Sequence, residues 1–275
     1  MTDLNVHSGE ATLAGEVRGD GPALVFLHAG VADRRMWDGV VETVAGTHRT
    51  VAYDRRGFGG TPPHKEAYSH TNDLLAVLDA AGISHATLVG CSQGGKVALD
   101  FTLAHPERVS ALVLVAPAVG GAPAVDTFPQ DVEALLEDLE AAEESEDLDR
   151  LNLLEARVWL DGVLGAEGRV QGDLRDLFVE MNGVALQAAP QVGEETPPPP
   201  AWPRLGEIAV PTLLVWGDLD FPHAQERCQT MSELIPDARG RVMHGTAHLP
   251  SFEDPESFST LLTDFLTEVE QTDRP

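Results

Sequence analysis

Short apolar runs alternate with amphipathic segments along the first 116 residues of the chain. The runs ALVFLH, TVAYD, ATLVG and SALVLVA begin at residues 23, 50, 86 and 110, and segments with helical spacing of apolar residues lie between them. The runs are apolar almost throughout, as strands buried on both faces are, and do not alternate as half-exposed strands do. Strands separated by helices in this way predict right-handed βαβ crossovers and a parallel sheet between layers of helices.

Both ends of the chain extend this pattern. Near the start, LNVHS and TLAGEVRG are separated by Gly9 and predict an antiparallel hairpin at one edge of the sheet. Near the end, the run TLLVWG, a helical segment at 223–234, the short run RGRVMH and a final helix from Pro255 repeat the βα order. The sequence therefore predicts one α/β fold with a mostly parallel central sheet flanked by helices.

Between these two parts, three helical segments follow one another with no strand-like run between them. The acidic run at 137–149 fits a solvated helix face and the turn after it. The segment TPPPPAWP at 196–203 predicts an extended, stiff return path, because consecutive prolines cannot continue inside a helix. We therefore expect a first core segment at 1–120, a helical insertion at 121–203 and a second core segment at 204–275.

Composition narrows the class of protein. The 275 residues are 43% hydrophobic and 23% charged, and no apolar run approaches the roughly 20 residues that span a bilayer. Asp and Glu total 45 against 18 Lys and Arg, a net charge of −27 that repels nucleic acid and anionic membranes. Only Cys91 and Cys228 are cysteines, so we expect no disulfide framework. The opening residues lack the pattern of a secretory signal, so we expect a cytoplasmic protein with a small-molecule partner.

The central run ATLVG leads into a motif that carries chemistry. Gly90, Cys91, Ser92, Gln93 and Gly94 form G-x-S-x-G between this run and a helical segment, the strand-turn-helix context that the motif requires. The glycines are needed because a serine on so sharp a turn has a strained backbone, and its neighbours must be small. Ser92 is therefore a candidate nucleophile, and the N–H of Gln93 lies at a helix N-terminus, where negative charge is favoured.

A serine hydroxyl is a weak nucleophile until a base takes its proton, so the motif needs a histidine and a carboxylate that orients it. The run TLLVWG is followed by Asp218 and Asp220, and RGRVMH contains His244 and is followed by His248. Serine, then aspartate, then histidine, each on a loop after a strand, is an order known for such triads on parallel sheets.

Four groups of residues together resemble the α/β-hydrolase superfamily over nearly the whole chain. They are His28-Ala29-Gly30 after the first core strand, YDRRGFG after the second, the turn at Ser92, and the late pair formed by residues 217–220 and Ala247-His248. The stretches LHAGVADRRMWD and VALDFTLAHPERVSALVLVAP are most similar to the 3-oxoadipate enol-lactonase and related esterase branch. The resemblance implies an α/β-hydrolase fold in which residues 121–203 form a helical cap over the active site.

The resemblance also implies a role for each residue of the triad. Ser92 is the expected nucleophile, and His248, ahead of the final helix, is the expected base. Asp220 is the expected acid, and Asp218 is the alternative. His244, at the end of a strand-like run, is expected to be structural.

An oxyanion hole in this family takes one N–H from the residue after the nucleophile and one from the loop after the first core strand. Here these residues are Gln93 and Gly30. Because the usual His-Gly start is replaced by His28-Ala29-Gly30, Val31 is the alternative second donor. We expect His28 itself to order the loop.

Other reactive side chains near these motifs are expected to have no catalytic role. Asp54 and Arg56 are expected to brace their turn, and the side chain of Cys91 to point away from that of Ser92. His244 and His248 are spaced like a metal-binding pair on a helix, but the glycine and threonine between them make a poor helix. We therefore expect neither a metal nor a cofactor.

Together these features predict a serine hydrolase that cleaves a small to medium carboxylic ester or lactone through an acyl-enzyme on Ser92. A serine at this turn disfavours the dehalogenase and epoxide hydrolase branches of the fold, which place an aspartate there. Two alternatives stay open: a cofactor-free lyase or carbon–carbon hydrolase, and a ligand receptor with a slow triad. Candidates to line an apolar pocket in the cap, or to pack between its helices, are Trp159, Phe178, Met181 and Trp202.

Overall fold

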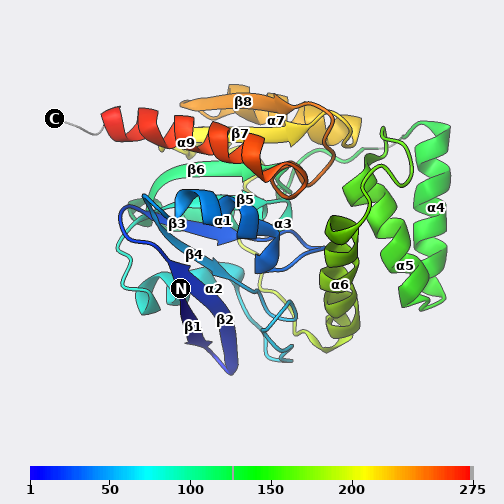
Figure 1. Cartoon of the computed structure of the whole chain (residues 1–275), viewed down its shortest axis with the longest axis horizontal. Helices are drawn as coiled ribbons and strands as arrows, with labels where there is room; N and C mark the ends of the chain where they lie inside the picture. Colours follow the sequence, from blue (N-terminus) through cyan, green and yellow to red (C-terminus); the bar gives the residue numbers. More distant parts are fainter. Residues whose placement is uncertain (126, 273–275) are drawn as a thin grey trace.

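The described residues of this computed structural model, 1–125 and 127–272, contain one eight-stranded sheet (Figure 1). Its order is β1-β2-β4-β3-β5-β6-β7-β8. The strands are β1 (Thr2–Ser8), β2 (Ala11–Arg18), β3 (Ala23–Leu27), β4 (Arg49–Tyr53), β5 (Ala86–Cys91), β6 (Val109–Val115), β7 (Thr212–Gly217) and β8 (Ala238–Met243). Strands β3 to β8 are parallel, whereas β2 is antiparallel to both β1 and β4. The predicted mostly parallel sheet with an antiparallel hairpin at one edge is confirmed.

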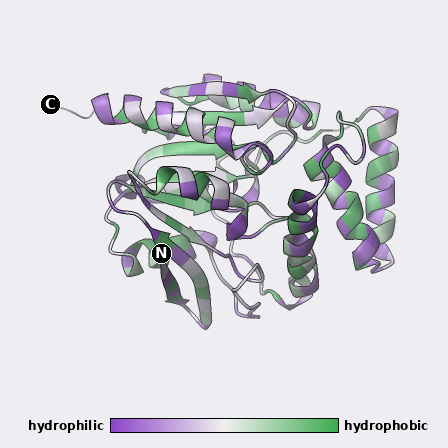
Figure 2. Cartoon of the chain, viewed as in Figure 1, coloured by the Kyte–Doolittle hydropathy of each residue, from purple (hydrophilic) through white to green (hydrophobic). Residues whose placement is uncertain are grey.

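Helices cover both faces of this sheet. On one face α1 (Asp38–Val44) packs with α9 (Pro255–Thr272), and on the other lie α2 (His70–Ala80), α3 (Gln93–Ala104) and α7 (Pro222–Leu234) (Figure 1). Figure 2 shows apolar residues along the central strands and a mixture of polar and apolar residues on the surrounding helices. Among the described residues, no helix has the length and apolar character needed to cross a bilayer.

Successive strand residues enter the two apolar layers in turn. Val25 of β3 and Leu88 of β5 are register partners, and both contribute to the layer beneath α2, α3 and α7. Their neighbours Phe26 and Val89 pair in the same way and contribute to the layer beneath α1 and α9. All four are buried, and full burial of such a side chain is worth about 1.5–3 kcal/mol. The central strands are therefore fixed from both sides, and so are the loops that leave their carboxyl ends.

The segment between β6 and β7 is helical, as its sequence pattern predicts. Helices α4 (Gln130–Glu144), α5 (Leu148–Glu155) and α6 (Asp173–Ala188) gather beyond one end of the sheet (Figure 1). In the described residues of the proline-rich return path, no helix precedes the 3-10 helix Trp202–Glu207. The insertion therefore leaves the sheet after one central strand and returns at the next.

Within the predicted helical insertion one stretch is a π-helix, and a short helix ahead of α9 lies outside the predicted elements. Residues Ala156–Gly162 form a π-helix that follows α5, and a short helix, α8 (Pro250–Glu253), precedes α9. A Cβ on Gly162 would lie 2.7 Å from the Cβ of Ala247, so the π-helix touches the loop that leads into α8. Single π-helical turns are rare and occur often at functional sites.

Candidate active site

Ser92 lies on the turn between β5 and α3 with a φ of 51° and a ψ of −114°. Such a conformation costs a non-glycine residue about 1–3 kcal/mol and persists only where the surroundings fix it. The turn can close because its neighbours lack side chains. A Cβ on Gly90 would lie 2.4 Å from the carbonyl oxygen of Gly94, and one on Gly94 would lie 2.2 Å from that of Leu27. The glycines of the motif are therefore required by close backbone contacts.

Three residues that are far apart in the sequence meet at this turn. The Oγ of Ser92 lies 2.9 Å from Nε2 of His248, and Nδ1 of His248 lies 2.7 Å from Oδ2 of Asp220. Asp220 follows β7, and His248 follows β8, so each side chain is presented from the carboxyl end of a parallel strand. The structure thus brings Ser92, Asp220 and His248 into one hydrogen-bonded chain.

The hydrogen bonds of Asp220 set the tautomer of His248. Its Oδ1 accepts the backbone N–H of Phe221 at 2.8 Å, and its Oδ2 faces Nδ1 of the imidazole. An ionised carboxylate can only accept, so the ring proton lies on Nδ1 and leaves Nε2 able to accept the proton of Ser92. Asp220 is 1% exposed and His248 is 7% exposed, so water competes little for these bonds.

Asp218 and His244, the alternatives in the sequence, form a separate pair. Nδ1 of His244 lies 2.8 Å from Oδ2 of Asp218, whose Oδ1 accepts the N–H of Gly245 at 2.7 Å. The side chain of His244 is 83% exposed, in contrast to His248. Each histidine is thus bonded to a different aspartate, and the two imidazoles do not converge as metal ligands would.

The π-helix places an aromatic ring against His248. The ring of Trp159 lies against that of His248 with 4.7 Å between centroids, and against Phe221 with 5.5 Å between centroids. The helix can approach this closely because its last residue is Gly162, with a φ of 86°. A Cβ at this glycine would lie 2.5 Å from the carbonyl oxygen of Leu219.

A cavity of about 290 Å³ opens beside Ser92 and His248. Its walls are mostly apolar and are formed by Ala116, Ala118, Phe128, Leu136, Trp159, Phe221, His223, Ala224 and Arg227. Of the four cap residues predicted to line a pocket or to pack, only Trp159 lines this cavity. Phe178 and Met181 are fully buried in an apolar cluster, and Trp202 packs on the cluster at the opposite face of the sheet. Phe128, Leu136 and Phe221 also line the cavity and were not predicted, because nothing in their local sequence pattern separates a pocket wall from a core residue.

Gly30 and Gln93, the two residues predicted to supply N–H donors, adjoin one another. A Cβ on Gly30 would lie 2.6 Å from Cδ of Gln93, so the loop after β3 touches the first residue of α3. An N–H in the first turn of a helix has no acceptor within that helix. No hydrogen bond between described residues uses the N–H of Gly30, Val31 or Gln93. N–H groups without an acceptor, one of them on the residue that follows Ser92, are what a developing oxyanion requires.

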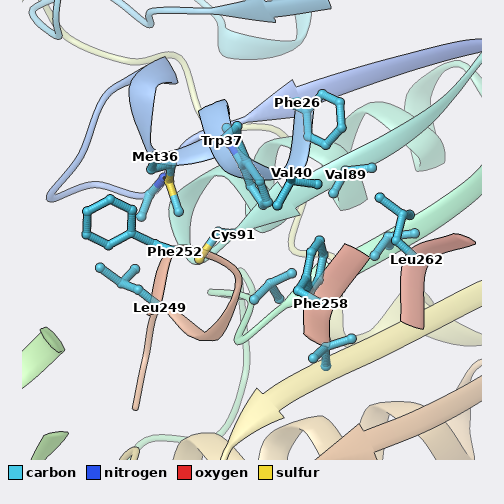
Figure 3. Close-up of a cluster of buried hydrophobic side chains, with 14 of the residues drawn as sticks. Phe26, Met36, Trp37, Val40, Val89, Cys91, Leu249, Phe252, Phe258 and Leu262 are labelled. Atoms are coloured by element: carbon cyan, nitrogen blue, oxygen red, sulfur yellow. The ribbon is translucent and has the colours of Figure 1, made fainter. Parts of the chain in front are cut away.

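Cys91 points away from the serine that follows it. Its side chain is fully buried, and Figure 3 shows it in an apolar cluster near Met36, Leu249 and Phe252. Burial raises the pKa of the Cys91 thiol well above its ordinary value. The sulfur is therefore kept as an unreactive thiol, in line with the sequence-based expectation.

Asp54 and Arg56 hold the loop after β4 in place. Asp54 accepts the backbone N–H groups of Arg34 and Gly60, each at 2.8 Å. Arg56 donates from Nε and Nη2 to the carboxylate of Asp73 at 2.8 and 2.9 Å. Both side chains therefore brace their turn, as their positions in the motif predicted.

Comparison with known proteins agrees with this geometry. Residues 22–255 match the family described as the alpha/beta hydrolase fold. The chain belongs to the α/β-hydrolase family. The resemblance drawn from the motifs is thus confirmed at the level of the superfamily.

Relatives of this α/β-hydrolase cleave different kinds of bond. It is 26% identical over 283 residues to 2-hydroxy-6-oxo-6-phenylhexa-2,4-dienoate hydrolase of Comamonas testosteroni, with 97% of this chain and 92% of the relative covered. It is 26% identical over 266 residues to pimeloyl-(acyl-carrier protein) methyl ester esterase of Aeromonas hydrophila, with 90% and 96% covered. A solved N-acyl homoserine lactone degrading enzyme superposes with a TM-score of 0.74 at 25% identity, over 95% of this chain and 100% of the other. The protein is therefore a hydrolase of this family.

Proposed function

We propose that this α/β-hydrolase cleaves a small to medium carboxylic ester or lactone through an acyl-enzyme on Ser92. The observation that carries the proposal is the unbroken hydrogen-bonded chain from Ser92 through His248 to Asp220. A nucleophile within reach of a base, and a base oriented by an acid, are what nucleophilic catalysis by serine needs. In this proposal residues 1–120 and 204–275 form the catalytic core, and residues 121–203 form a cap over the site.

In the first half-reaction, Oγ of Ser92 attacks the acyl carbonyl carbon while its proton passes to Nε2 of His248. Asp220 holds the ring and stabilises the imidazolium that forms, without taking the proton itself. When the tetrahedral intermediate collapses, the bond to the leaving oxygen breaks and that oxygen takes the proton from Nε2. An ester then releases its alcohol, whereas a lactone opens and keeps the new hydroxyl on the acyl chain.

In the second half-reaction, water replaces the alcohol. His248 takes a proton from the water as its oxygen attacks the acyl carbon, and returns that proton to Oγ of Ser92 as the carboxylic acid leaves. The same base therefore serves both steps. Trp159 covers one face of the imidazole and leaves Nε2 directed at the reacting oxygen atoms.

In this proposal the N–H groups of Gly30 and Gln93 stabilise the negative charge that develops on the carbonyl oxygen. Both N–H groups are unpaired among the described residues, and the two residues adjoin one another. The N–H of Gln93 also points from the N-terminus of α3, where the helix dipole favours an anion. One such donor is worth about 3–4 kcal/mol of transition-state stabilisation.

The cavity beside the triad has the size and the apolar walls to hold an apolar group of modest size on the substrate. Its volume of about 290 Å³ lies at the small end of the range for ligand pockets, and Phe128, Leu136 and Phe221 give it apolar walls. Because Ser92 and His248 form part of the same wall, the group must be attached close to the scissile carbonyl. Esters and lactones with a short or medium apolar chain fit this description.

Carbon–carbon bond hydrolysis is the second candidate. The observation that favours it is the similarity to the dienoate hydrolase of Comamonas testosteroni, which covers 97% of this chain. The same Ser92, His248 and Asp220 would act, but the leaving group would be a carbanion equivalent that must be protonated at carbon. A vinylogous diketone substrate and a simple ester of matched size therefore distinguish the two candidates.

The test begins with the intact mass of the protein after incubation with a fluorophosphonate. The wild type is expected to gain one adduct, because only an activated serine reacts quickly with this reagent. The Ser92→Ala variant is expected to gain none, and the matched variant Ser84→Ala, on a remote exposed turn, should react like the wild type. Esters and lactones of increasing chain length are then screened on the wild type.

Persistence of the adduct in Ser92→Ala contradicts the proposal. If Ser92 is labelled but only the vinylogous diketone turns over, the second candidate replaces the first. An unlabelled wild type that binds esters without cleaving them means that the protein is a receptor rather than an enzyme.

A further inference from the structure

Arg55 is a buried cation that the proposed triad does not use. It lies in the loop after β4 and is 2% exposed, and it takes part in none of the ion pairs among the described residues. Its neighbour Arg56 differs, because two carboxylates neutralise it. Burial lowers the pKa of the Arg55 guanidinium to about 10, which leaves it charged at neutral pH. The carboxylate of Glu195 acts on this charge without forming an ion pair with it, and a buried charge that lacks a direct ion pair is costly.

The guanidinium of Arg55 contacts both segments that carry the proposed oxyanion donors. Its Nη2 donates to the carbonyl oxygens of His28 at 3.2 Å and Ala29 at 3.1 Å. Its Nη1 donates to Oε1 of Gln93 at 3.1 Å. One rigid group thus joins the loop after β3 to the first residue of α3.

A second donor converges on the same carbonyl oxygen. Nε2 of His28 accepts the backbone N–H of Arg55 at 2.9 Å, so the proton of the neutral ring lies on Nδ1. Nδ1 then donates to the carbonyl oxygen of Ala29 at 2.7 Å. Burial, together with the charge of Arg55, lowers the pKa of His28 well below its ordinary value and keeps the ring neutral. The carbonyl of Ala29 is therefore held by two buried donors.

This carbonyl belongs to the peptide unit whose N–H is that of Gly30. The peptide bonds of the described residues include no cis bond, and in a trans peptide the C=O and N–H point in opposite directions. Holding the oxygen of Ala29 toward Arg55 therefore directs the N–H of Gly30 away from Arg55. A cation on the oxygen also draws electron density from the peptide and makes its N–H a stronger donor.

We propose that Arg55 is the positioning residue of the oxyanion hole: it fixes the Ala29–Gly30 peptide and the Gln93 side chain so that the two N–H donors face the reacting carbonyl oxygen. The inference rests on the proposed function, because it concerns the anion formed on attack by Ser92. Arg55 does not touch the substrate. Its fixed charge lies behind the donors and is in no direct ion pair with a carboxylate among the described residues, so it favours the anionic intermediate over the neutral substrate.

The test compares two ligands in the wild type and in Arg55→Met. A trifluoromethyl ketone is attacked by serine and bears an oxyanion when bound, whereas the matching methyl ketone binds without charge. Arg55→Met is expected to lower both the affinity for the trifluoromethyl ketone and kcat by about 10–100-fold, because a misplaced donor loses part of its effect. Affinity for the methyl ketone should stay within about twofold, since the substrate cavity is unchanged.

Two controls separate positioning from folding. Arg108→Met removes a guanidinium that donates to the loop carbonyl groups of Ile83 and Ser84, remote from Ser92. This variant should bind both ketones as the wild type does. Arg55→Ala should regain activity when methylguanidinium is added, because Arg55 lines an open cavity of about 520 Å³ through which the reagent can enter. If Arg55→Met does not fold, Arg55→Lys keeps the charge but cannot bridge Ala29 and Gln93, and an intermediate loss is expected.

Equal loss of affinity for both ketones, with no rescue by methylguanidinium, overturns the positioning role and leaves Arg55 as a packing residue. That result differs from failure of the proposed function. In the latter case the wild type itself binds the trifluoromethyl ketone no more tightly than the methyl ketone, and the inference about Arg55 falls with it.

Discussion

Trp159 lies against His248 with 4.7 Å between the ring centroids and 48° between the ring planes. The indole comes from the π-helix between β6 and β7, whereas the imidazole comes from the loop after β8. The helical insertion therefore completes the surroundings of His248, and it also supplies part of the apolar cavity beside Ser92. The site is a joint product of the core and the insertion.

Replacing Trp159 tests this contact. Trp159→Ala is expected to lower kcat by about 2–10-fold, since an aromatic contact of this kind is worth about 0.5–1.5 kcal/mol and the freed imidazole can leave Ser92. Trp159→Phe should keep most of the rate. Trp202→Ala is the matched control, because that indole packs on the opposite face of the sheet. Steady-state kinetics with a short-chain p-nitrophenyl ester measure the effect, and an unchanged kcat in Trp159→Ala would show that the contact is only packing.

The two candidate acids are separated by a pair of isosteric variants. Asp220→Asn is expected to lower kcat by about 10³–10⁴-fold, because an amide cannot stabilise the imidazolium and can hold His248 in the wrong tautomer. Asp218→Asn should keep kcat within about threefold, since Asp218 contacts the exposed His244 instead. The same ester assay serves both variants. The reverse order of effects assigns the acid to Asp218.

Much of the fold could be predicted because its signals are local. The strands read as continuous apolar runs, and the glycines around Ser92 follow from the steric needs of one turn. Ser92, Asp220 and His248 each follow a strand, so their meeting at the carboxyl ends of a parallel sheet could be predicted from their order in the chain. The choice of Asp220 over Asp218 needed the family resemblance, because both follow the same strand by a few residues.

The parts that escaped prediction depend on contacts between distant segments. Nothing in the stretch around Arg55 indicates that its guanidinium will meet the carbonyl oxygen of Ala29 and the amide of Gln93. The π-helix likewise depends on tertiary packing, since Gly162 fits between the loop after β7 at Leu219 and the loop after β8 at Ala247. Pairings of this kind involve side chains whose partners are set only once the sheet has formed.

Thiol reactivity tests whether Cys91, the residue before Ser92, is inert. Burial raises the pKa of both Cys91 and Cys228, so each remains a protonated thiol even at about pH 8.5, the ordinary pKa of cysteine. Iodoacetamide is expected to leave the native protein unmodified and to modify both cysteines after unfolding, as intact mass will show. Rapid modification of Cys91 in the native protein, with loss of activity, would instead place this thiol within the site.

Arg169 joins the insertion to the loop that carries His248, and its removal should affect stability. Its guanidinium pairs with Glu253 and donates to the carbonyl oxygens of Leu160 and Gly245 at 2.6 and 2.9 Å. Glu253 in turn accepts the N–H of Ala247 at 2.9 Å. Arg169→Met leaves a buried carboxylate unpaired. It is expected to lower the free energy of unfolding by about 3 kcal/mol, the lower end of the range for a broken buried ion pair. Arg150→Met, which breaks an exposed pair with Asp138, should cost below about 1 kcal/mol.

The loss in free energy of unfolding caused by Arg169→Met should depend on pH, and the titration of Glu253 determines the direction of that dependence. Burial already raises the pKa of this carboxyl, and the pairing with Arg169 opposes that rise. Without Arg169 the pKa rises further above its unfolded value, so the folded state binds the proton more tightly, and stability falls as pH rises through that folded pKa. Urea unfolding should therefore show a deficit that grows from mildly acidic to neutral pH, because the folded variant keeps the proton on Glu253 to a higher pH than the unfolded chain does. Arg169→Met combined with Glu253→Gln should lose this dependence, and a deficit that stays constant with pH in the single variant would mean that Arg169 acts through its carbonyl contacts alone.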